Sequence, residues 1–288
     1  MATAKEIKSK MGSVRSTQKI TRAMELIAAS KVRLAKQRMD RAKPYAECAR
    51  EIIRHLARAH PEYHHPYLKP RPVNQVGMIL VSSDRGLCGG LNLNLFRECV
   101  RALLRFQKMK IPVKVAVIGQ KAQSFVRKCA VEVLAAKVHL GDKPGVMEVV
   151  GSVQVMLDAY AQETIDELYI FSNAFISTIK QKPYERKLLP IEPAEDLHLN
   201  YHWDYLYEPE AKPVLDQLFT RYIESQVYQA VVENIACEQA ARMVAMKNAT
   251  DNAGEVIKDL KLQYNKARQA AITKELAEIV SGAEAQNE

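Results

Sequence analysis

The sequence predicts a two-part fold, in which a small α/β domain lies between two unusually long helices. Glycine and proline, which end helices, are concentrated in the middle of the 288-residue chain. Eleven of the 12 prolines lie between Pro61 and Pro213, and eight of the 11 glycines lie between Gly77 and Gly151. Both ends are almost free of these residues and are rich in Ala, Lys, Arg, Met and Glu, which favour helix.

Each end carries apolar and small residues at alternating spacings of three and four, which is the pattern of a coiled-coil seam. The predicted seam positions are Ile20, Ala23, Ile27, Ser30 and Leu34 in the first arm and Ile257, Leu260, Tyr264, Ala267 and Ala271 in the last. Many nearby positions are alanine and bury little apolar area. We therefore expect a helical pair that is weakly held on its own.

The length of the arms is a functional clue. At about 1.5 Å per residue, residues 2–57 would form a helix of roughly 80 Å and residues 214–281 one of roughly 100 Å. A compact chain of this size is only about 50 Å across. We expect the arms to project as a rod, suited to be an axle or spacer inside a partner. A kink at Pro44 or a break at Gly254 would instead fold the rod back.

The middle of the chain alternates between strand and helix patterns. Apolar, β-branched runs cover residues 76–83, 113–119, 130–138 and 167–173, and helical patterns cover residues 93–107, 120–128 and 145–163. This alternation predicts βαβ units in a Rossmann-like, mostly parallel sheet. A charged, Pro-rich stretch from Lys180 to Pro213 is expected to return the chain to the last arm.

The predicted organisation has five parts. They are an N-terminal coiled-coil helix (1–58), a linker (59–75), the α/β domain (76–195), a second linker or foot (196–213) and a C-terminal coiled-coil helix (214–288).

The net charge of +9 is confined to the first arm. Residues 1–58 hold 15 Lys and Arg against five Asp and Glu, while the remainder is close to neutral. A basic helix of this kind suits nucleic acid, a lipid surface or an acidic protein surface, or it is simply a solvated face. Because no aromatic residue between Met1 and Pro44 could stack on bases, an acidic protein surface is favoured over nucleic acid.

The Gly-rich turn from Ser82 to Asn92 is a candidate phosphate site, because backbone amides at a helix N-terminus can bind anions. It lacks the G-x-G-x-x-G spacing, and no P-loop motif is present. A structural turn that exposes Arg85 and Cys88 is therefore expected, with nucleotide binding kept as an alternative.

No catalytic, metal or cofactor site is expected. The five cysteines form no C-x-x-C pair, no Ser-His-Asp pattern occurs, and the histidines lack acidic or thiolate neighbours. We expect reduced thiols and surface histidines at His60, His64, His65, His198 and His202. No apolar run approaches the roughly 20 residues of a membrane-spanning helix, and the first residues look like neither a secretory signal nor a transit peptide.

Four longer segments make the chain resemble one family, the γ subunits of F-type ATP synthases. They are IKSKMGSVRSTQKITRAMELIAASKVRLA, SSDRGLCGGLNLNLF, WDYLYEP, and RYIESQVYQAVVENIACEQAARMVAMKNATDNA followed by YNKARQAAITKELAEIVSGA. The resemblance extends over essentially the whole chain. It implies that the two arms form an antiparallel coiled coil inside a hexamer of alternating α and β subunits (α3β3).

The resemblance also implies a role for the other parts. The α/β domain would bind the ε subunit and the membrane ring of c subunits, and ion flow would turn the ring and this chain together. The rotating axle would then move each β subunit through its nucleotide-binding states. The chain would be a non-catalytic coupler in ATP synthesis and hydrogen ion transport.

Contact residues follow from the family only where its motifs match. Those matching positions near the β levers and loops are Met24, Lys31, Arg33, Lys36, Arg85, Cys88, Arg242, Arg268, Gln269 and Thr273. Those matching the foot on the c ring are Tyr205, Tyr207 and Glu208. For each of them, a coiled-coil surface or seam role is the alternative.

The resemblance places the chain on the cytoplasmic side of a bacterial inner membrane, as a peripheral subunit. The cysteine-containing regulatory insert of chloroplast homologues is absent, so thiol control is not expected.

Overall fold

The computed structural model describes residues 4–59, 65–129, 131–191 and 211–284. The chain divides into two compact units, one formed by residues 1–28 with 243–288 and the other by residues 29–242. Helix α1 covers Ala4–Ala59 and helix α5 covers Ala211–Glu284, so each helix contributes to both units. Pro44 and Gly254 lie inside these helices and end neither of them.

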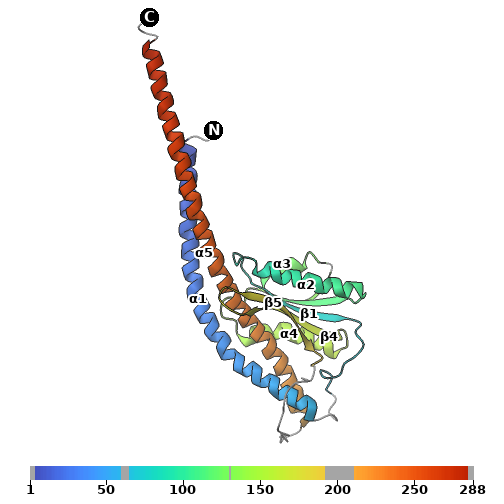
Figure 1. Ribbon diagram of the computed structural model, residues 1–288. Coiled ribbons are helices and arrows are strands. Elements are labelled where there is room, and N and C mark those ends of the chain that lie inside the picture. Colours follow the sequence, from blue (N-terminus) through green and yellow to red (C-terminus); the bar gives the residue numbers. More distant parts are fainter. Residues whose placement is uncertain (1–3, 60–64, 130, 192–210, 285–288) are drawn as a thin grey trace. The chain divides into compact units, whose positions relative to one another are not determined.

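The larger unit contains a five-stranded sheet in the order β3-β2-β1-β4-β5. Its parallel strands are β1 (Val76–Val81), β2 (Val113–Ile118), β3 (Glu132–Lys137) and β4 (Glu167–Phe175), and β5 (Gln181–Leu189) runs antiparallel to β4. Helices α2 (Leu91–Lys108), α3 (Gln120–Val126) and α4 (Val146–Ala161) connect the parallel strands. The predicted mostly parallel α/β domain between two long helices is confirmed (Figure 1).

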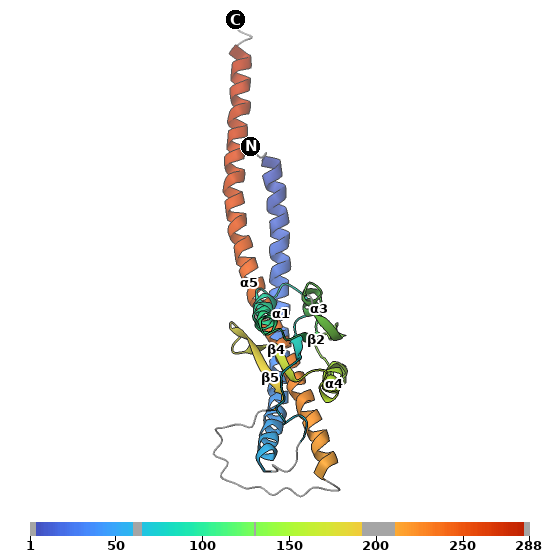
Figure 2. The same cartoon turned by 90° about the vertical axis from the view of Figure 1, so that its right-hand side faces the viewer.

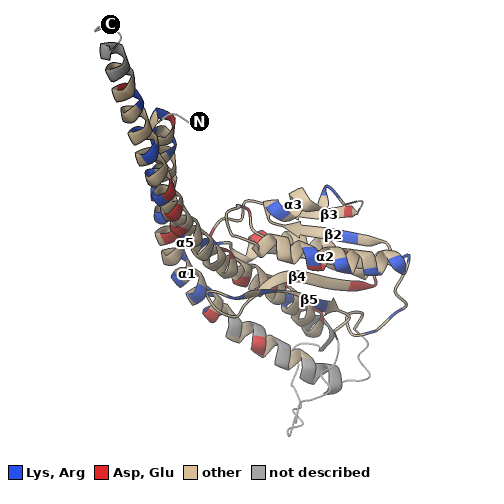
Figure 3. Ribbon diagram, turned by 45° about the horizontal axis from the view of Figure 1, so that its top comes forward, with Lys and Arg blue, Asp and Glu red and all other residues tan. Residues whose placement is uncertain are grey.

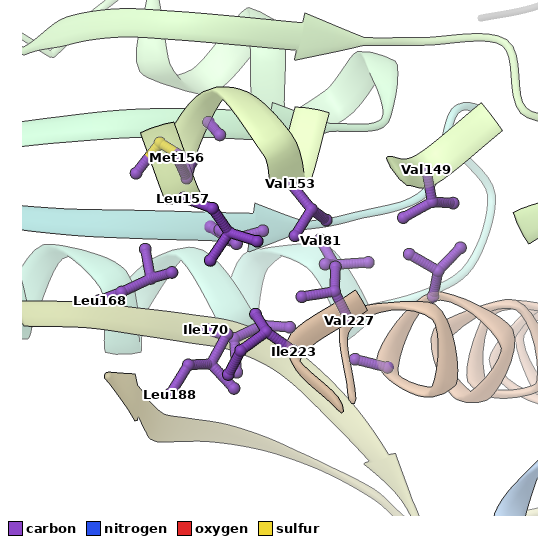
Figure 4. Close-up of a cluster of buried hydrophobic side chains, with 14 of the residues drawn as sticks. Val81, Val149, Val153, Met156, Leu157, Leu168, Ile170, Leu188, Ile223 and Val227 are labelled. Carbon is purple, nitrogen blue, oxygen red and sulfur yellow. The ribbon is translucent and has the colours of Figure 1, made fainter. Parts of the chain in front are cut away.

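Both faces of the sheet are covered, which is why its central strand is an unbroken apolar run. Alternate β1 residues point to opposite faces: Met78 and Leu80 lie in the cluster formed with α2 and α3, and Ile79 and Val81 lie in the cluster formed with α4 and α5. Figure 4 shows Val153 and Met156 of α4 and Ile223 and Val227 of α5 in the second cluster. The sheet therefore holds the first part of α5 as one of its own core elements.

Strand β5 was not predicted. It carries charged residues at Lys182 and at positions 185–187, and Pro183 lies within it, which removes a backbone donor. The strand is stable at the edge of the sheet because its charged side chains have cross-element partners. Lys187 pairs with Glu167 at 2.7 Å, and Glu185 pairs with Arg105 of α2.

The predicted seam of the first arm is wrong in register. Ile20 and Ile27 are 60% and 56% exposed, whereas the buried row consists of Ile7, Thr21 and Ala28. The half-buried residues Met11, Val14, Gln18 and Glu25 complete this row at spacings of three and four. Ile20, Leu26 and Ile27 thus lie outside the contact, and the row within it mixes the apolar residues Ile7, Met11 and Val14 with small or polar ones.

Residues 4–28 of α1 and 243–284 of α5 pack antiparallel, as the resemblance implied (Figure 2). The Thr21 and Thr250 hydroxyls lie 2.8 Å apart, and Gln18 Nε2 donates to the Thr250 carbonyl at 3.3 Å. Gly254 gives Gln18 room, because a Cβ there would lie 3.2 Å from Gln18 Nε2. The predicted seam of α5 is confirmed at Ile257, Leu260, Tyr264 and Ala267, which are buried or half-buried, and it ends before Ala271, which is exposed.

His65 is not the surface residue that the sequence predicted. It is 6% exposed, stacks on Phe219 and lies 3.2 Å from Asp216. Burial lowers the pKa of His65, with a smaller opposing effect of Asp216, so the imidazole is a neutral core group at neutral pH. His60, His64, His198 and His202 lie outside the described residues.

Among the described residues, no helix has the length and apolar character needed to cross a bilayer. No group of three His, Cys, Asp or Glu side chains in those ranges could hold a metal ion.

The register of the first arm predicts opposite outcomes for the same substitution at two alanines. Ala28 is 1% exposed, so Ala28→Leu should overpack the contact and lower the free energy of unfolding by about 1–3 kcal/mol. Ala23 is exposed, so Ala23→Leu should change it by less than about 0.5 kcal/mol. Thermal unfolding of the chain followed by circular dichroism measures both. An equal or larger loss at Ala23 would restore the register that the sequence predicted.

Candidate partner-contact site

The turn from Ser82 to Asn92 follows β1 and leads into α2. Asn92 Nδ2 donates to Ser83 Oγ at 2.7 Å, and Ser83 Oγ donates in turn to the Arg85 carbonyl at 2.7 Å. Leu87 and Gly89 have positive φ values of 63° and 58°, which let the chain reverse tightly. The turn is therefore held by its own side chains, and it presents Arg85 to solvent as predicted.

Cys88 is a correction to the sequence prediction, which had it exposed. Its side chain is 3% exposed and packs in a small buried cluster with Leu91, Cys237 and Ala241. Burial raises the pKa of the Cys88 thiol. The residue joins the turn to α5 and offers no surface to a partner in this structure.

The nucleotide alternative for this turn loses support. Two of the amides that could cradle a phosphate are used within the turn, since Ser83 N donates to Asn92 Oδ1 and Leu91 N donates to the Cys88 carbonyl, both at 3.3 Å. The turn connects β1 to α2 and packs against α5.

Arg242 is also buried, at 8% exposure, although a partner contact was predicted for it. Its Nη2 donates to Glu238 Oε1 at 2.6 Å and to the Gly86 carbonyl at 3.1 Å, and its Nη1 donates to Gln239 Oε1 at 3.2 Å. Burial raises the pKa of Glu238, and the Arg242 charge opposes this rise. Arg242 thus fastens α5 to the Ser82–Asn92 turn.

Lys31 is half-buried and is engaged within the chain. Its Nζ lies 2.6 Å from Asp142 Oδ2, in the loop between β3 and α4. The structure therefore brings Lys31, Arg242 and the turn with Arg85 and Cys88 into one region of the larger unit. Asp142 was missed by the sequence analysis, because a lone acidic residue in a Gly-Asp-Lys-Pro loop carries no signal of a long-range partner.

The other predicted contact residues among the described ranges are accessible. Met24 is half-buried, and the exposed residues are Arg33, Lys36, Arg85, Arg268, Gln269 and Thr273. Lys and Arg recur along α1 (Figure 3). Tyr205, Tyr207 and Glu208 lie outside the described residues.

In the smaller unit the predicted contacts form two separate levels. Met24 lies one turn after Thr21, and Thr21 contacts Thr250 of α5, so Met24 is near the level of Thr250. Arg268 lies 18 residues beyond Thr250 along α5. At 1.5 Å per residue this separation is about 27 Å. Met24 and the group at Arg268, Gln269 and Thr273 would therefore meet different parts of a partner.

The same unit exposes large apolar residues that the sequence analysis had assigned to the seam or passed over. On α1 these are Ile20, Leu26 and Ile27, at 60%, 58% and 56% exposure. On α5 they are Leu262, Ile272, Leu276 and Ile279, at 63%, 48%, 57% and 67%. Ile20 and Ile27 are seven residues apart, as are Ile272 and Ile279, so each pair lies on one face of its helix.

Comparison with known proteins identifies the family. The ATP synthase family model matches residues 3–286. The ATP synthase gamma chain of Nitrosococcus oceani is 58% identical over 288 residues, which cover 99% of this chain and all of that protein. The gamma chain of Legionella pneumophila strain Corby is 56% identical over 287 residues, with the same coverage of both chains.

The chain belongs to the ATP synthase gamma chain family. The prediction of a gamma chain, a non-catalytic subunit of the ATP synthase complex, is confirmed.

Solved structures show the same fold at much lower identity. A chain of the Euglena gracilis mitochondrial ATP synthase, in a structure of OSCP, F1 and c-ring, superposes with a TM-score of 0.69 at 19% identity, covering 98% of this chain and 94% of that one. A chain from the central stalk and c-ring of the Tetrahymena thermophila enzyme gives a TM-score of 0.60 at 23% identity, covering 80% and 99%.

The buried pair of Arg242 and Glu238 predicts a pH-dependent loss of stability. Arg242→Met leaves the Glu238 carboxylate buried without its cation, which should lower the free energy of unfolding by about 3–5 kcal/mol at neutral pH. The pKa of Glu238, already raised by burial, should rise further. The stability lost relative to wild type should therefore be smallest at acid pH and should grow as the pH rises through that raised pKa.

Urea unfolding of the chain between acid and neutral pH measures this effect. The control is the double variant Arg242→Met with Glu238→Met, which removes both charges and should recover most of the neutral-pH loss. A single variant whose loss is independent of pH would contradict the assignment.

Proposed function

We propose that this gamma chain is the rotating shaft of a bacterial ATP synthase. Its long helices turn inside a ring of three α and three β subunits, and its α/β domain is joined to the ε subunit and the c ring. Ion flow through the c ring is thereby coupled to ATP synthesis or hydrolysis on β.

The observation that supports this most is the outward face of α1 in residues 4–28. The side of the helix toward α5 carries Ile7 together with Thr21 and Ala28, while Ile20 and Ile27 face outward. A helix pair that leaves large apolar residues exposed along its length is suited to an apolar surround. A ring of subunits around the helix pair would provide it.

Cationic and polar residues complete the proposed contacts. Arg33, Lys36 and Arg85 are exposed cations that suit an acidic lever segment of β. Arg268, Gln269 and Thr273 are exposed on α5 and suit a β loop at another level, with Met24 near an apolar part of the lever. Exposed charge pairs are individually weak and screened, which fits contacts that form and break during rotation.

The mechanism is a differential stabilisation of β conformations. A β subunit shifts toward the state that makes the better contacts with whichever face of the helix pair it meets. Turning the shaft changes that face, so rotation and nucleotide affinity are linked, and the link acts equally in both directions. The chain therefore needs no catalytic group of its own.

The proposed location is the cytoplasmic side of the bacterial inner membrane, where the chain is peripheral and attached through the c ring. The full-length bacterial relatives support this placement. The foot residues Tyr205, Tyr207 and Glu208 are proposed to meet the c ring on the family resemblance alone.

Single-molecule rotation of the reconstituted complex tests the function. Because Cys88 is buried, the label belongs at an exposed site, such as Lys108→Cys at the end of α2, with Cys48 and Cys129 replaced by Ser. Combined with its α and β subunits, this variant should turn an attached bead in one direction when ATP is added. A complex that hydrolyses ATP while the bead stays still would contradict the proposal.

A further inference from the structure

Asp142 connects the α/β domain to both long helices within the larger unit. Its Oδ2 accepts from Lys31 Nζ of α1 at 2.6 Å, and its backbone carbonyl accepts from Arg38 Nη1 of α1 at 2.7 Å. Its Oδ1 accepts from Gln239 Nε2 of α5 at 3.3 Å. Lys31 and Arg38 are seven residues apart, so they lie on one face of α1 two turns from each other.

The loop that carries Asp142 is fixed to the domain before that residue and to α5 after it. Leu140 is 9% exposed and belongs to the apolar core. His139 N donates to Asp84 Oδ1 at 3.1 Å, and Tyr228 of α5 donates to the Pro144 carbonyl at 3.4 Å. Gly141, with φ of +69°, supplies the reversal that aims Asp142 at the helices. Asp142 therefore moves with the sheet.

Gln239 extends the connection to the Ser82–Asn92 turn. Its amide nitrogen donates to Asp142, and its amide oxygen accepts from Arg242, which also donates to the Gly86 carbonyl. A continuous polar chain thus joins α1, the β3–α4 loop, α5 and the turn. We name it the Asp142 clamp, formed by Lys31, Arg38, Asp142, Glu238, Gln239 and Arg242.

A polar joint adds a directional restraint to the apolar contacts of these helices. The apolar contacts already oppose rotation of α5, because rotation would expose buried side chains such as Ile223 and Val227. Hydrogen bonds weaken steeply when their angles change. The clamp therefore fixes how α1 and α5 are rotated with respect to the domain.

We propose that the Asp142 clamp is the joint that carries torque between the α/β domain and the two helices, with Asp142 as its central positioning residue. The proposal rests on the function proposed above. It assigns Lys31 and Arg242 to an internal joint, in place of direct contact with β.

The test measures coupling in the complete ATP synthase, reconstituted in vesicles with Asp142→Ala or Asp142→Asn. The readout is the number of protons pumped per ATP hydrolysed, together with the ATP synthesis rate. Asp142→Ala should lower both several-fold. Asp142→Asn keeps a neutral acceptor for Gln239 and should lie between that variant and the wild type. The matched control is Asp158→Asn, an exposed carboxylate on α4 of the same domain, which should couple normally.

A double variant separates the joint from a direct contact with β. If Lys31 acts through Asp142, Lys31→Ala combined with Asp142→Ala should lose no more coupling than Asp142→Ala alone. Losses that multiply would mean that Lys31 acts elsewhere, which overturns the proposal. Circular dichroism of the purified chain shows whether each variant folds, and the isosteric Asp142→Asn keeps the test valid if Asp142→Ala does not.

The outcomes also distinguish this proposal from the proposed function. A wild-type complex that couples normally, alongside an Asp142→Ala complex that couples equally well, overturns the clamp alone. A wild-type complex whose chain does not rotate overturns the function itself.

Discussion

The anchoring of α5 on the sheet is the contact on which the rest of the structure depends. Phe219, Ile223, Val227 and Ala236 are fully or almost fully buried in the core that β1, β4 and α4 also form. In the described part of the smaller unit the buried residues are Ile7, Thr21, Ala28, Met246, Ala253 and Leu260, which bury less apolar area than the core of the larger unit. The long helices are therefore held more firmly in the larger unit than in the smaller one.

This difference in apolar burial between the two units suits the proposed shaft, which would contact other subunits. The smaller unit leaves large apolar residues such as Ile20 and Leu262 exposed, which suits the proposed contact with other subunits. The larger unit adds directional hydrogen bonds at Asp142 and Arg242 to an apolar core that already buries one face of α5. Apolar burial thus holds the helices against the domain, and the hydrogen bonds add to the control of their orientation.

The sequence predicted the two long helices and the parallel strands because Gly and Pro spacing and apolar runs are strong local signals. The pattern misplaces the seam of α1 because it predicts burial for large apolar residues, whereas the structure buries Ala28 and exposes Ile27. Strand β5 was missed because an edge strand can be charged. Cys88, His65 and Arg242 were misjudged because their burial depends on long-range contacts that one sequence does not display.

Native-state hydrogen exchange of the isolated chain tests the anchoring most directly, because it reports opening free energies along each helix. Amides of α5 between residues 219 and 242 should exchange slowest, by opening reactions as costly as global unfolding. Amides in residues 4–28 and 243–284 should exchange through much cheaper local openings. Uniform protection along α5, or greatest protection in residues 243–284, would contradict the account.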